Sequence, residues 1–152
     1  KRITYWPQLF LGLTFNWGII MAWTAVNNSI SAEILILYAS AIFWTLGYDT
    51  IYGTQDIIDD EIIGIKSTSI NFKNNLKLFV SFCYFMNTFL VIFLFHNKFD
   101  LNIFSIFIML YILSLTYQLI KFKKNQPKEC LKLFKINNVS GFLLFFGIFL
   151  IN

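Results

Sequence analysis

Charged residues are scarce in this 152-residue chain, making up 13% of it, whereas 57% of its residues are hydrophobic. About a quarter of the residues of an ordinary soluble domain are charged, so the composition argues against a soluble globular protein. Long apolar runs recur along the sequence, and a helix needs about 20 apolar residues to cross a bilayer. The scarcity of charge therefore predicts an all-α membrane protein with several transmembrane helices.

Cysteine and histidine are also rare. Cys83 and Cys130 lie far apart, and neither belongs to a CxxC motif or a Cys/His pair. We therefore interpret them as buried, inert thiols rather than as metal ligands or a disulfide. The single histidine, His96, stands at the end of an apolar run, where an interfacial residue is expected rather than a ligand.

Five segments are long and apolar enough to be membrane-spanning helices. They lie at roughly 8–27, 33–54, 76–95, 101–120 and 138–151. The last segment is short, so it is expected to begin somewhat earlier or to end tilted. Pro7 suits the opening of the first helix. Asn137 and Asn138 are expected to begin and cap the last one.

The positive charges follow these five helices closely. Eleven of the twelve basic residues fall on one side of the predicted membrane, and only Lys98 falls on the other. Such a bias marks the cytoplasmic side. It also accounts for the net charge of +4 without a nucleic-acid partner. The eleven residues are Lys1, Arg2, Lys66, Lys73 and Lys77, together with Lys121, Lys123, Lys124, Lys128, Lys132 and Lys135 in a basic loop at 121–135.

The acidic residues gather in one stretch on the same side. GYDTIYGTQDIIDDEIIGIKST, residues 47–68, holds five of the eight acids of the chain. Acidic residues contribute little to membrane topology, and like charges four residues apart destabilise a helix. The concentration of acids therefore indicates a site. The five residues are Asp49, Asp56, Asp59, Asp60 and Glu61.

The spacing of three of these acids suggests a common face. At about 100° per residue, Asp49, Asp56 and Asp60 fall within a narrow arc if the helix continues past Gly53. A group of carboxylates without His or Cys suits Mg²⁺, which is typically held by one or two carboxylates and a substrate phosphate. Lys66 comes shortly after these acids in the sequence.

Lys66 is followed by Ser67 and Thr68, and a cation with two hydroxyls suits a phosphate-bearing ligand. The alternative is a solvated acidic loop between two helices. Asp49 argues against that alternative, because an ionisable residue at the edge of a membrane helix is functional by default.

These residues resemble the second aspartate-rich motif of the UbiA family of intramembrane prenyltransferases. The specific pattern is Y-D-T-x-Y, then D-x-x-x-D, then G-x-K-S-T. The opening K-R-I-T-Y-W-P-Q-L-F-L-G and the later K-I-N-N-V-S-G-F-L-L-F also resemble the 4-hydroxybenzoate polyprenyltransferase branch of that family. The resemblance therefore extends over the whole chain.

The resemblance implies a fold and a reaction. The fold is a bundle of nine transmembrane helices around a central cavity, of which residues 1–152 would form the C-terminal part with the last five helices. The reaction is the Mg²⁺-dependent transfer of a polyprenyl group from polyprenyl diphosphate to 4-hydroxybenzoate, a step of ubiquinone biosynthesis. The implied location is the inner membrane of a bacterial cell.

The resemblance also assigns roles to single residues. Asp56 and Asp60 match the aspartate pair that holds Mg²⁺, and Lys66 matches a basic residue near the diphosphate. Arg2 matches an arginine near the substrates, where it pairs with the benzoate carboxylate or the diphosphate. Asp49 matches the aspartate of Y-D-T, and we expect it to bind substrate.

One departure and three alternatives remain. The first aspartate motif of the family, of the N-D-x-x-D-x-x-x-D type, is absent, and the chain begins with Lys1 rather than Met. We therefore expect a piece of a longer protein that lacks an N-terminal half and is incomplete as a catalyst. The alternatives are a cation channel or transporter with an acidic vestibule, an inactive remnant or split half-enzyme, and a related prenyltransferase that uses homogentisate or a naphthoate.

Overall fold

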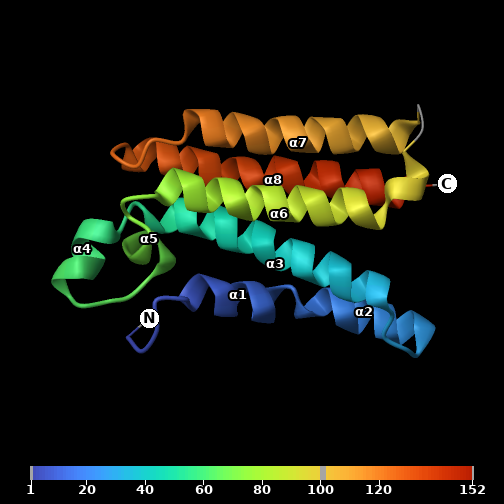
Figure 1. Cartoon of the computed structure of the whole chain (residues 1–152), viewed down its shortest axis with the longest axis horizontal. Coiled ribbons are helices and arrows are strands. Elements are labelled where there is room, and N and C mark those ends of the chain that lie inside the picture. Colours follow the sequence, from blue (N-terminus) through green and yellow to red (C-terminus); the bar gives the residue numbers. More distant parts are fainter. Residues whose placement is uncertain (1, 100–101, 152) are drawn as a thin grey trace.

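Long helices that run side by side make up the chain (Figure 1). The computed structural model describes residues 2–99 and 102–151, so Lys1, Asp100, Leu101 and Asn152 lie outside the described residues. No strand occurs in these two ranges, which confirms the all-α fold. The helices are α1 (Pro7–Phe15), α2 (Trp17–Asn27), α3 (Ala32–Gly53), α4 (Ile57–Ile62), α5 (Thr68–Asn71), α6 (Leu76–Leu94), the 3₁₀ turn η1 (His96–Lys98), α7 (Ile103–Lys121) and α8 (Pro127–Phe149).

Five helices are long and apolar enough to cross a membrane when α1 and α2 are counted as one span. The predicted segments 33–54, 76–95 and 101–120 agree with α3, α6 and α7 to within two residues. The prediction of a multi-helix membrane protein is thus confirmed.

The first span is interrupted at Asn16, which the sequence did not predict. The Asn16 side chain donates its Nδ2 hydrogens to the carbonyl of Gly12 at 2.8 Å and to Thr45 Oγ1 at 2.9 Å. An asparagine side chain that bonds to the backbone four residues earlier competes with the regular helical ladder. The helix therefore divides into α1 and α2 at this residue.

The last span begins at Pro127, well before the predicted 138. Proline suits the first turn of a helix, and Cys130 and Leu133, three residues apart, are both buried against the other helices. This packing stabilises a helical start that is too polar to be read as a membrane segment. The predictions that 121–135 is a loop and that Asn137 and Asn138 cap the helix are therefore wrong. Lys128, Lys132 and Lys135 lie on α8.

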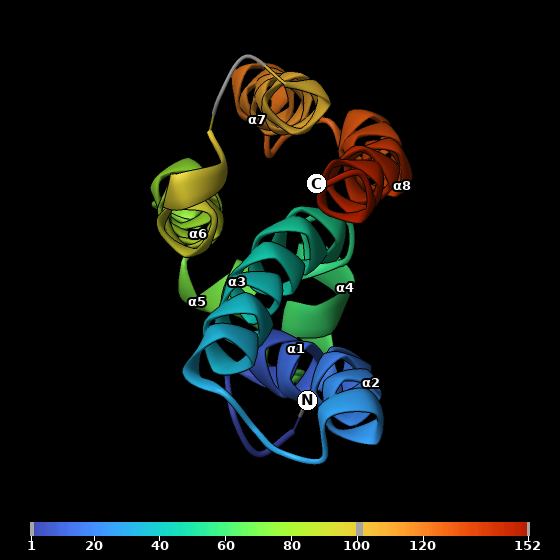
Figure 2. The same cartoon turned by 90° about the vertical axis from the view of Figure 1, so that its right-hand side faces the viewer.

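Helix α3 is the centre of the bundle. Viewed along the helices, α3 lies between the α1–α2 span on one side and α6 and α8 on the other, with α7 beyond them (Figure 2). In the most apolar stretch of each span, 44% of α3 is buried but only 11% of the α1–α2 span. Helix α3 thus provides the surface on which the other spans pack.

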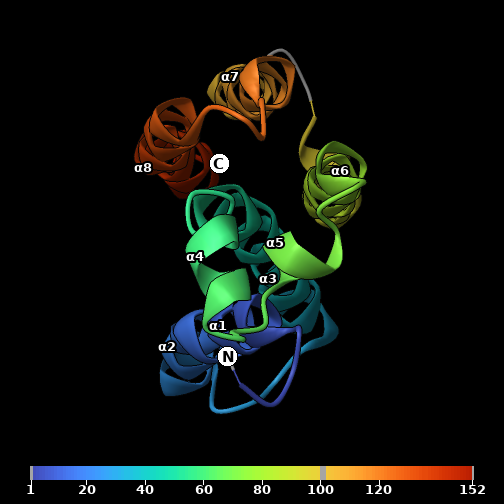
Figure 3. The ribbon, with the colours of Figure 1, turned by 90° about the vertical axis from the view of Figure 1, so that its left-hand side faces the viewer.

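The two ends of the bundle differ in charge. The N-terminal segment, α4, α5 and the α7–α8 turn lie at one end, while the α2–α3 turn, η1 and the C-terminal end of α8 lie at the other (Figures 1 and 3). Every described basic residue of the predicted cytoplasmic set belongs to the first end. This end also carries the acidic stretch.

Candidate active site

The acidic stretch folds into a turn and two short helices at the charged end of the bundle (Figure 3). Helix α3 ends at Gly53, and Thr54 caps it by donating its hydroxyl to the carbonyl of Ile51 at 2.7 Å. Helix α4 starts only at Ile57. Asp49 therefore does not share a continuous helix with Asp56 and Asp60, so the condition under which a common face was predicted for the three carboxylates is not met.

Helix α5 is pinned to α1 and α3 by buried hydrogen bonds. The backbone N–H of Thr68 donates to Gln8 Oε1 at 3.0 Å, and the hydroxyls of Thr68 and Thr50 share a bond of 2.7 Å. Ser69 Oγ donates to the carbonyl of Thr50 at 2.8 Å. Ser67 accepts from the N–H of Ile70 as the N-cap of α5. These contacts fix the segment that follows Lys66.

Ser67 and Thr68 were predicted to offer hydroxyls to a phosphate, and the structure gives both a different role. Ser67 is 1% exposed and Thr68 is fully buried. Their side chains bond within the protein, Ser67 to the helix it caps and Thr68 to Thr50. The hydroxyls therefore hold the scaffold of the site.

Asp56 and Asp60 are separated by one turn of helix. Asp56 precedes α4 as its N-cap residue, and its carbonyl accepts the N–H of Asp60 at 2.7 Å. Asp60 is 7% exposed and Asp56 is half-buried. In the described part of the chain neither side chain has a hydrogen bond or ion pair.

Asp60 is buried as a residue, but its carboxylate oxygens are not among the buried unpartnered side-chain atoms of the described residues, so they reach solvent. A carboxylate that has no protein partner and is open to solvent is free to bind a cation, and Asp56 lies one helical turn away. No group of three or more His, Cys, Asp and Glu side chains in residues 2–99 and 102–151 is placed to hold a metal. Two carboxylate ligands completed by substrate phosphate are what Mg²⁺ typically uses.

The other two acids of α4 face solvent. Asp59 and Glu61 are both exposed on α4. Glu61 Oε1 pairs at 2.6 Å with Nζ of Lys73, which lies in the turn between α5 and α6. Their exposure separates these two acids from the Asp56–Asp60 pair.

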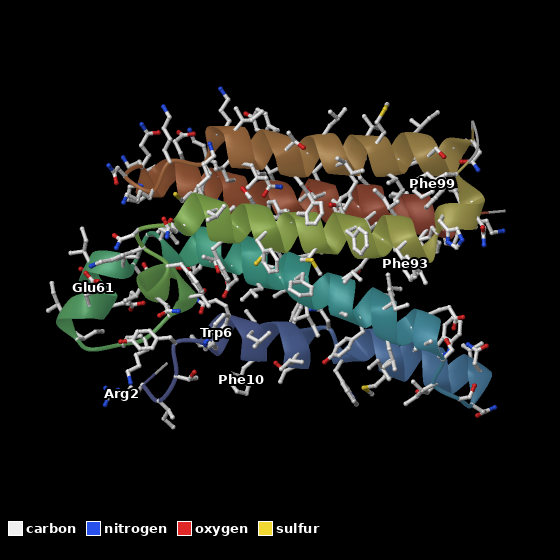
Figure 4. The ribbon with its side chains drawn as sticks, viewed as in Figure 1. Arg2, Trp6, Phe10, Glu61, Phe93 and Phe99 are labelled. Carbon is white, nitrogen blue, oxygen red and sulfur yellow. The ribbon has the colours of Figure 1, made fainter. Side chains whose placement is uncertain are left out.

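The two predicted basic site residues lie at the same end of the bundle. Lys66 is half-buried, and its Nζ lies 5.3 Å from the centre of the Tyr5 ring, a cation–π contact. Arg2 is exposed in the N-terminal segment below α4 (Figure 4). Asp49 lies inside α3, one turn before its end, and is half-buried. The structure thus gathers Arg2, Asp56, Asp60 and Lys66 at one end, with Asp49 one turn deeper.

A cavity of about 800 Å³ opens between α1–α2, α3 and α8, on the side where Figure 2 shows α8 and α2 flanking α3. Its walls are largely aromatic, and Tyr48 on that wall directly precedes Asp49. The cavity therefore leads from the apolar middle of the bundle towards the charged end. The rings that line it are Phe15, Trp44, Tyr48, Phe134, Phe142 and Phe145.

Polar side chains position part of this wall, which the sequence did not reveal. Trp44 Nε1 donates to Asn137 Oδ1 at 3.0 Å. Asn137 Nδ2 donates to Gln118 Oε1 at 3.1 Å, and Tyr84 donates its hydroxyl to the same oxygen at 2.8 Å. One buried network therefore joins α3, α6, α7 and α8. The available signal was a set of amides within apolar runs, which in a membrane bond across helices.

Asn16 and Asn87 are two further amides within the membrane-spanning helices, and their contacts differ. Asn16 lines the cavity and bonds across to Thr45. Asn87 is fully buried, donates to the carbonyl of Ser40 at 3.0 Å and accepts from the Tyr111 hydroxyl at 2.6 Å. Asn16 therefore lines the cavity and also bonds across helices, whereas Asn87 serves helix packing.

Comparisons with known proteins agree with this arrangement. The sequence model of the UbiA prenyltransferase family matches residues 1–147. A relative from Bos taurus named "4-hydroxybenzoate polyprenyltransferase, mitochondrial" is 40% identical over 154 aligned residues, which cover 100% of this chain and 41% of the relative. Relatives of the same name from Arabidopsis thaliana and Aedes aegypti are 54% and 52% identical over 82 residues, covering 53% of this chain and 20% and 19% of theirs.

The chain thus spans well under half the length of the curated relatives it matches. No solved structure matches it. The family match nevertheless covers nearly every residue, from the N-terminal segment through the acidic stretch to α8. The chain belongs to the UbiA prenyltransferase family.

Proposed function

We propose that the chain is part of an enzyme that transfers a polyprenyl group from polyprenyl diphosphate to the ring of 4-hydroxybenzoate, as in ubiquinone biosynthesis. The observation that carries the proposal is the pair Asp56 and Asp60, one turn of α4 apart, at the same end of the bundle as Lys66 and Arg2. The relatives' names support the choice of donor and acceptor. Because the chain covers only part of these relatives, the five spans are the C-terminal part of the catalytic domain in this proposal, and a preceding segment supplies the remaining acids.

The Asp56 and Asp60 carboxylates are the protein ligands of Mg²⁺ in this proposal. Bound there, Mg²⁺ would neutralise the diphosphate and make it a better leaving group. Asp60 is 7% exposed, and the N–H of Ile65 donates to its backbone carbonyl at 2.8 Å, which fixes the backbone that carries the carboxylate. A fixed backbone limits the rearrangement that Mg²⁺ binding would require.

Lys66 and Arg2 bind the anionic groups of the substrates. The contact with Tyr5 holds the Lys66 ammonium near the N-terminal segment that carries Arg2. Lys66 would then face the diphosphate, and Arg2 the diphosphate or the benzoate carboxylate. Asp49 lies one turn before the C-terminal end of α3. Its role is to orient the polar head of a substrate.

The aromatic cavity excludes water from the reacting carbon. The allylic C–O bond breaks with its electron pair leaving on the diphosphate, and the ring carbon ortho to the phenol hydroxyl forms the new C–C bond. That carbon then loses its proton. A water-free apolar cavity prevents hydrolysis of the allylic cation, and the walls around Trp44 and Phe145 offer such surroundings for the isoprenoid tail.

The membrane orientation and compartment follow from charge in the same proposal. The end with the acidic stretch and most of the basic residues faces the cytoplasm of a bacterium, in the inner membrane, or the equivalent compartment of a mitochondrion. The relatives named above are mitochondrial. Fusing a reporter to either end of α7 in living cells tests this orientation.

Prenyl transfer by the longer protein that contains these residues tests the site. We expect Asp56→Asn and Asp60→Asn each to lower kcat at least about 100-fold at saturating Mg²⁺, since several kcal/mol of charge stabilisation are lost. Asp59→Asn, an exposed neighbour on α4, is the matched control and should stay within about threefold. Equal effects at the three positions would refute the metal role.

A further inference from the structure

A second cavity, of about 440 Å³, lies at the charged end, outside the aromatic one. It is enclosed by the connection from α3 to α4, the turn between α5 and α6, and the turn between α7 and α8. None of the residues that line it belongs to the proposed catalytic set. Its polar lining consists of Thr54, Gln55, Lys73, Asn74, Lys124 and Asn125.

We propose that this cavity, the headgroup pocket, binds the phosphodiester headgroup of an anionic glycerophospholipid. Two lysines and two asparagine amides provide donors for phosphate oxygens. Lys124 Nζ also donates to the Lys73 carbonyl at 3.4 Å and so closes the pocket between two turns far apart in sequence.

The surroundings of the pocket favour a lipid over a free anion. One wall is apolar, with Ile57, Leu76 and Pro127, and Leu76 and Pro127 open the membrane-spanning helices α6 and α8. A ligand with a charged head and an acyl chain that continues along these helices therefore fits better than a soluble phosphate. Basic pockets between transmembrane helices at the cytoplasmic end are typical headgroup sites.

Charge around the pocket adds to this preference. Lys121, Lys123 and Lys128 are exposed in or beside the α7–α8 turn, so the local field is positive. Acidic residues are also near. Asp56 stands between the lining residues Gln55 and Ile57, and Glu129, which pairs with Lys132, lies two positions after Pro127. The Glu61 carboxylate pairs with Lys73 at 2.6 Å. This Lys73–Glu61 pair is half-exposed, and a bound phosphodiester would compete with Glu61 for Lys73.

Native mass spectrometry of the full chain in neutral detergent tests the proposal, with phosphatidylglycerol and phosphatidylcholine of identical acyl chains as probes. We expect phosphatidylglycerol to bind about tenfold more tightly. The double variant Lys73→Gln/Lys124→Gln should lose that preference. Lys77→Gln/Lys135→Gln, which removes the same charge from exposed residues outside the pocket, should keep it.

Four results would overturn the proposal. Equal affinities for the two lipids would remove the headgroup preference, and equal losses in both double variants would mean diffuse attraction to a basic surface. Displacement of the lipid by millimolar inorganic phosphate would indicate a free-anion site. Glu61→Gln should tighten phosphatidylglycerol binding, because it releases Lys73, and an unchanged affinity would contradict the role of Lys73. None of these readouts depends on prenyl transfer, so they stand apart from the proposed enzyme activity.

Discussion

Gly53, the last residue of α3, permits the close approach of α5 that positions the acidic stretch. A Cβ atom added at this position would lie 2.5 Å from Ser69 Oγ and 3.3 Å from Gln8 Nε2. Ser69 is fully buried, and its hydroxyl donates to the carbonyl of Thr50 at 2.8 Å. The substitution Gly53→Ala must therefore displace this hydroxyl and loosen α5.

The cost follows from two unfavourable terms and one favourable term. Overpacking of a buried site costs about 1–3 kcal/mol, and the displaced hydroxyl loses a hydrogen bond worth about 1 kcal/mol. Alanine regains at most about 1 kcal/mol over glycine through helix propensity. We expect Gly53→Ala to lower the free energy of unfolding by about 1–3 kcal/mol. Prenyl transfer should also fall, because Asp60 and Lys66 lie in the segment between Gly53 and α5.

A double-mutant cycle identifies the responsible contact. With Ser69→Ala in place, the nearest remaining Ser69 atom to the added methyl group is Cβ at 3.5 Å, an ordinary contact. The double variant should therefore be more stable than the sum of the single changes by about 1–2 kcal/mol. Unfolding in mixed micelles measures stability, and prenyl transfer by the longer protein measures the effect on the site.

Gly18→Ala is the matched control, since no atom lies within 4 Å of a Cβ added there. It should leave stability unchanged or raise it slightly. If Gly53→Ala proved as stable as Gly18→Ala, or if the cycle with Ser69→Ala were additive, the close approach of α5 to α3 would not hold the acidic stretch in place.

Three further substitutions test other parts of the structure. Gly47→Ala places a Cβ 2.6 Å from Tyr84 Cε1 and should destabilise the α3–α6 contact by about 1–3 kcal/mol; unfolding midpoints equal to the parent's would contradict this packing. Asn137→Leu leaves Trp44 Nε1 without its acceptor and should cost about 1–3 kcal/mol in the same unfolding assay, whereas Asn138→Leu, at an exposed neighbour, should change stability by less than about 0.5 kcal/mol. Lys66→Gln should raise KM for the diphosphate donor about tenfold with the acceptor KM unchanged, and an unaltered donor KM in steady-state kinetics would rule out its contact with the diphosphate.

Much of the fold could be predicted because membrane helices can be recognised by their length and hydrophobicity. Helices α3 and α6 begin and end within a residue of the predicted bounds. The start of α8 escaped prediction because its first turns carry Lys128 and Lys132 and are apolar on one side only. Burial of Cys130 and Leu133, a tertiary effect, makes that stretch helical.

The candidate site was predictable in its residues but not in its geometry. The pair Asp56 and Asp60, together with Lys66, follows from the motif and its resemblance to the UbiA family. Ser69, 16 positions after Gly53, packs against the end of α3, and no local pattern encodes that approach. The same holds for Trp44 and Asn137, which meet across 93 positions of sequence.

The sequence by itself determined that the chain is a membrane bundle, where its charges divide, and to which family it belongs, because hydrophobic length, charge bias and a dense motif are local properties. Only the tertiary structure decided that Asp60 is buried without a partner among the described residues, that Ser67 and Thr68 serve as scaffold, and that an aromatic cavity lies beside Asp49. Those features arise from contacts between distant segments, and burial and hydrogen-bond partners exist only once these segments have packed.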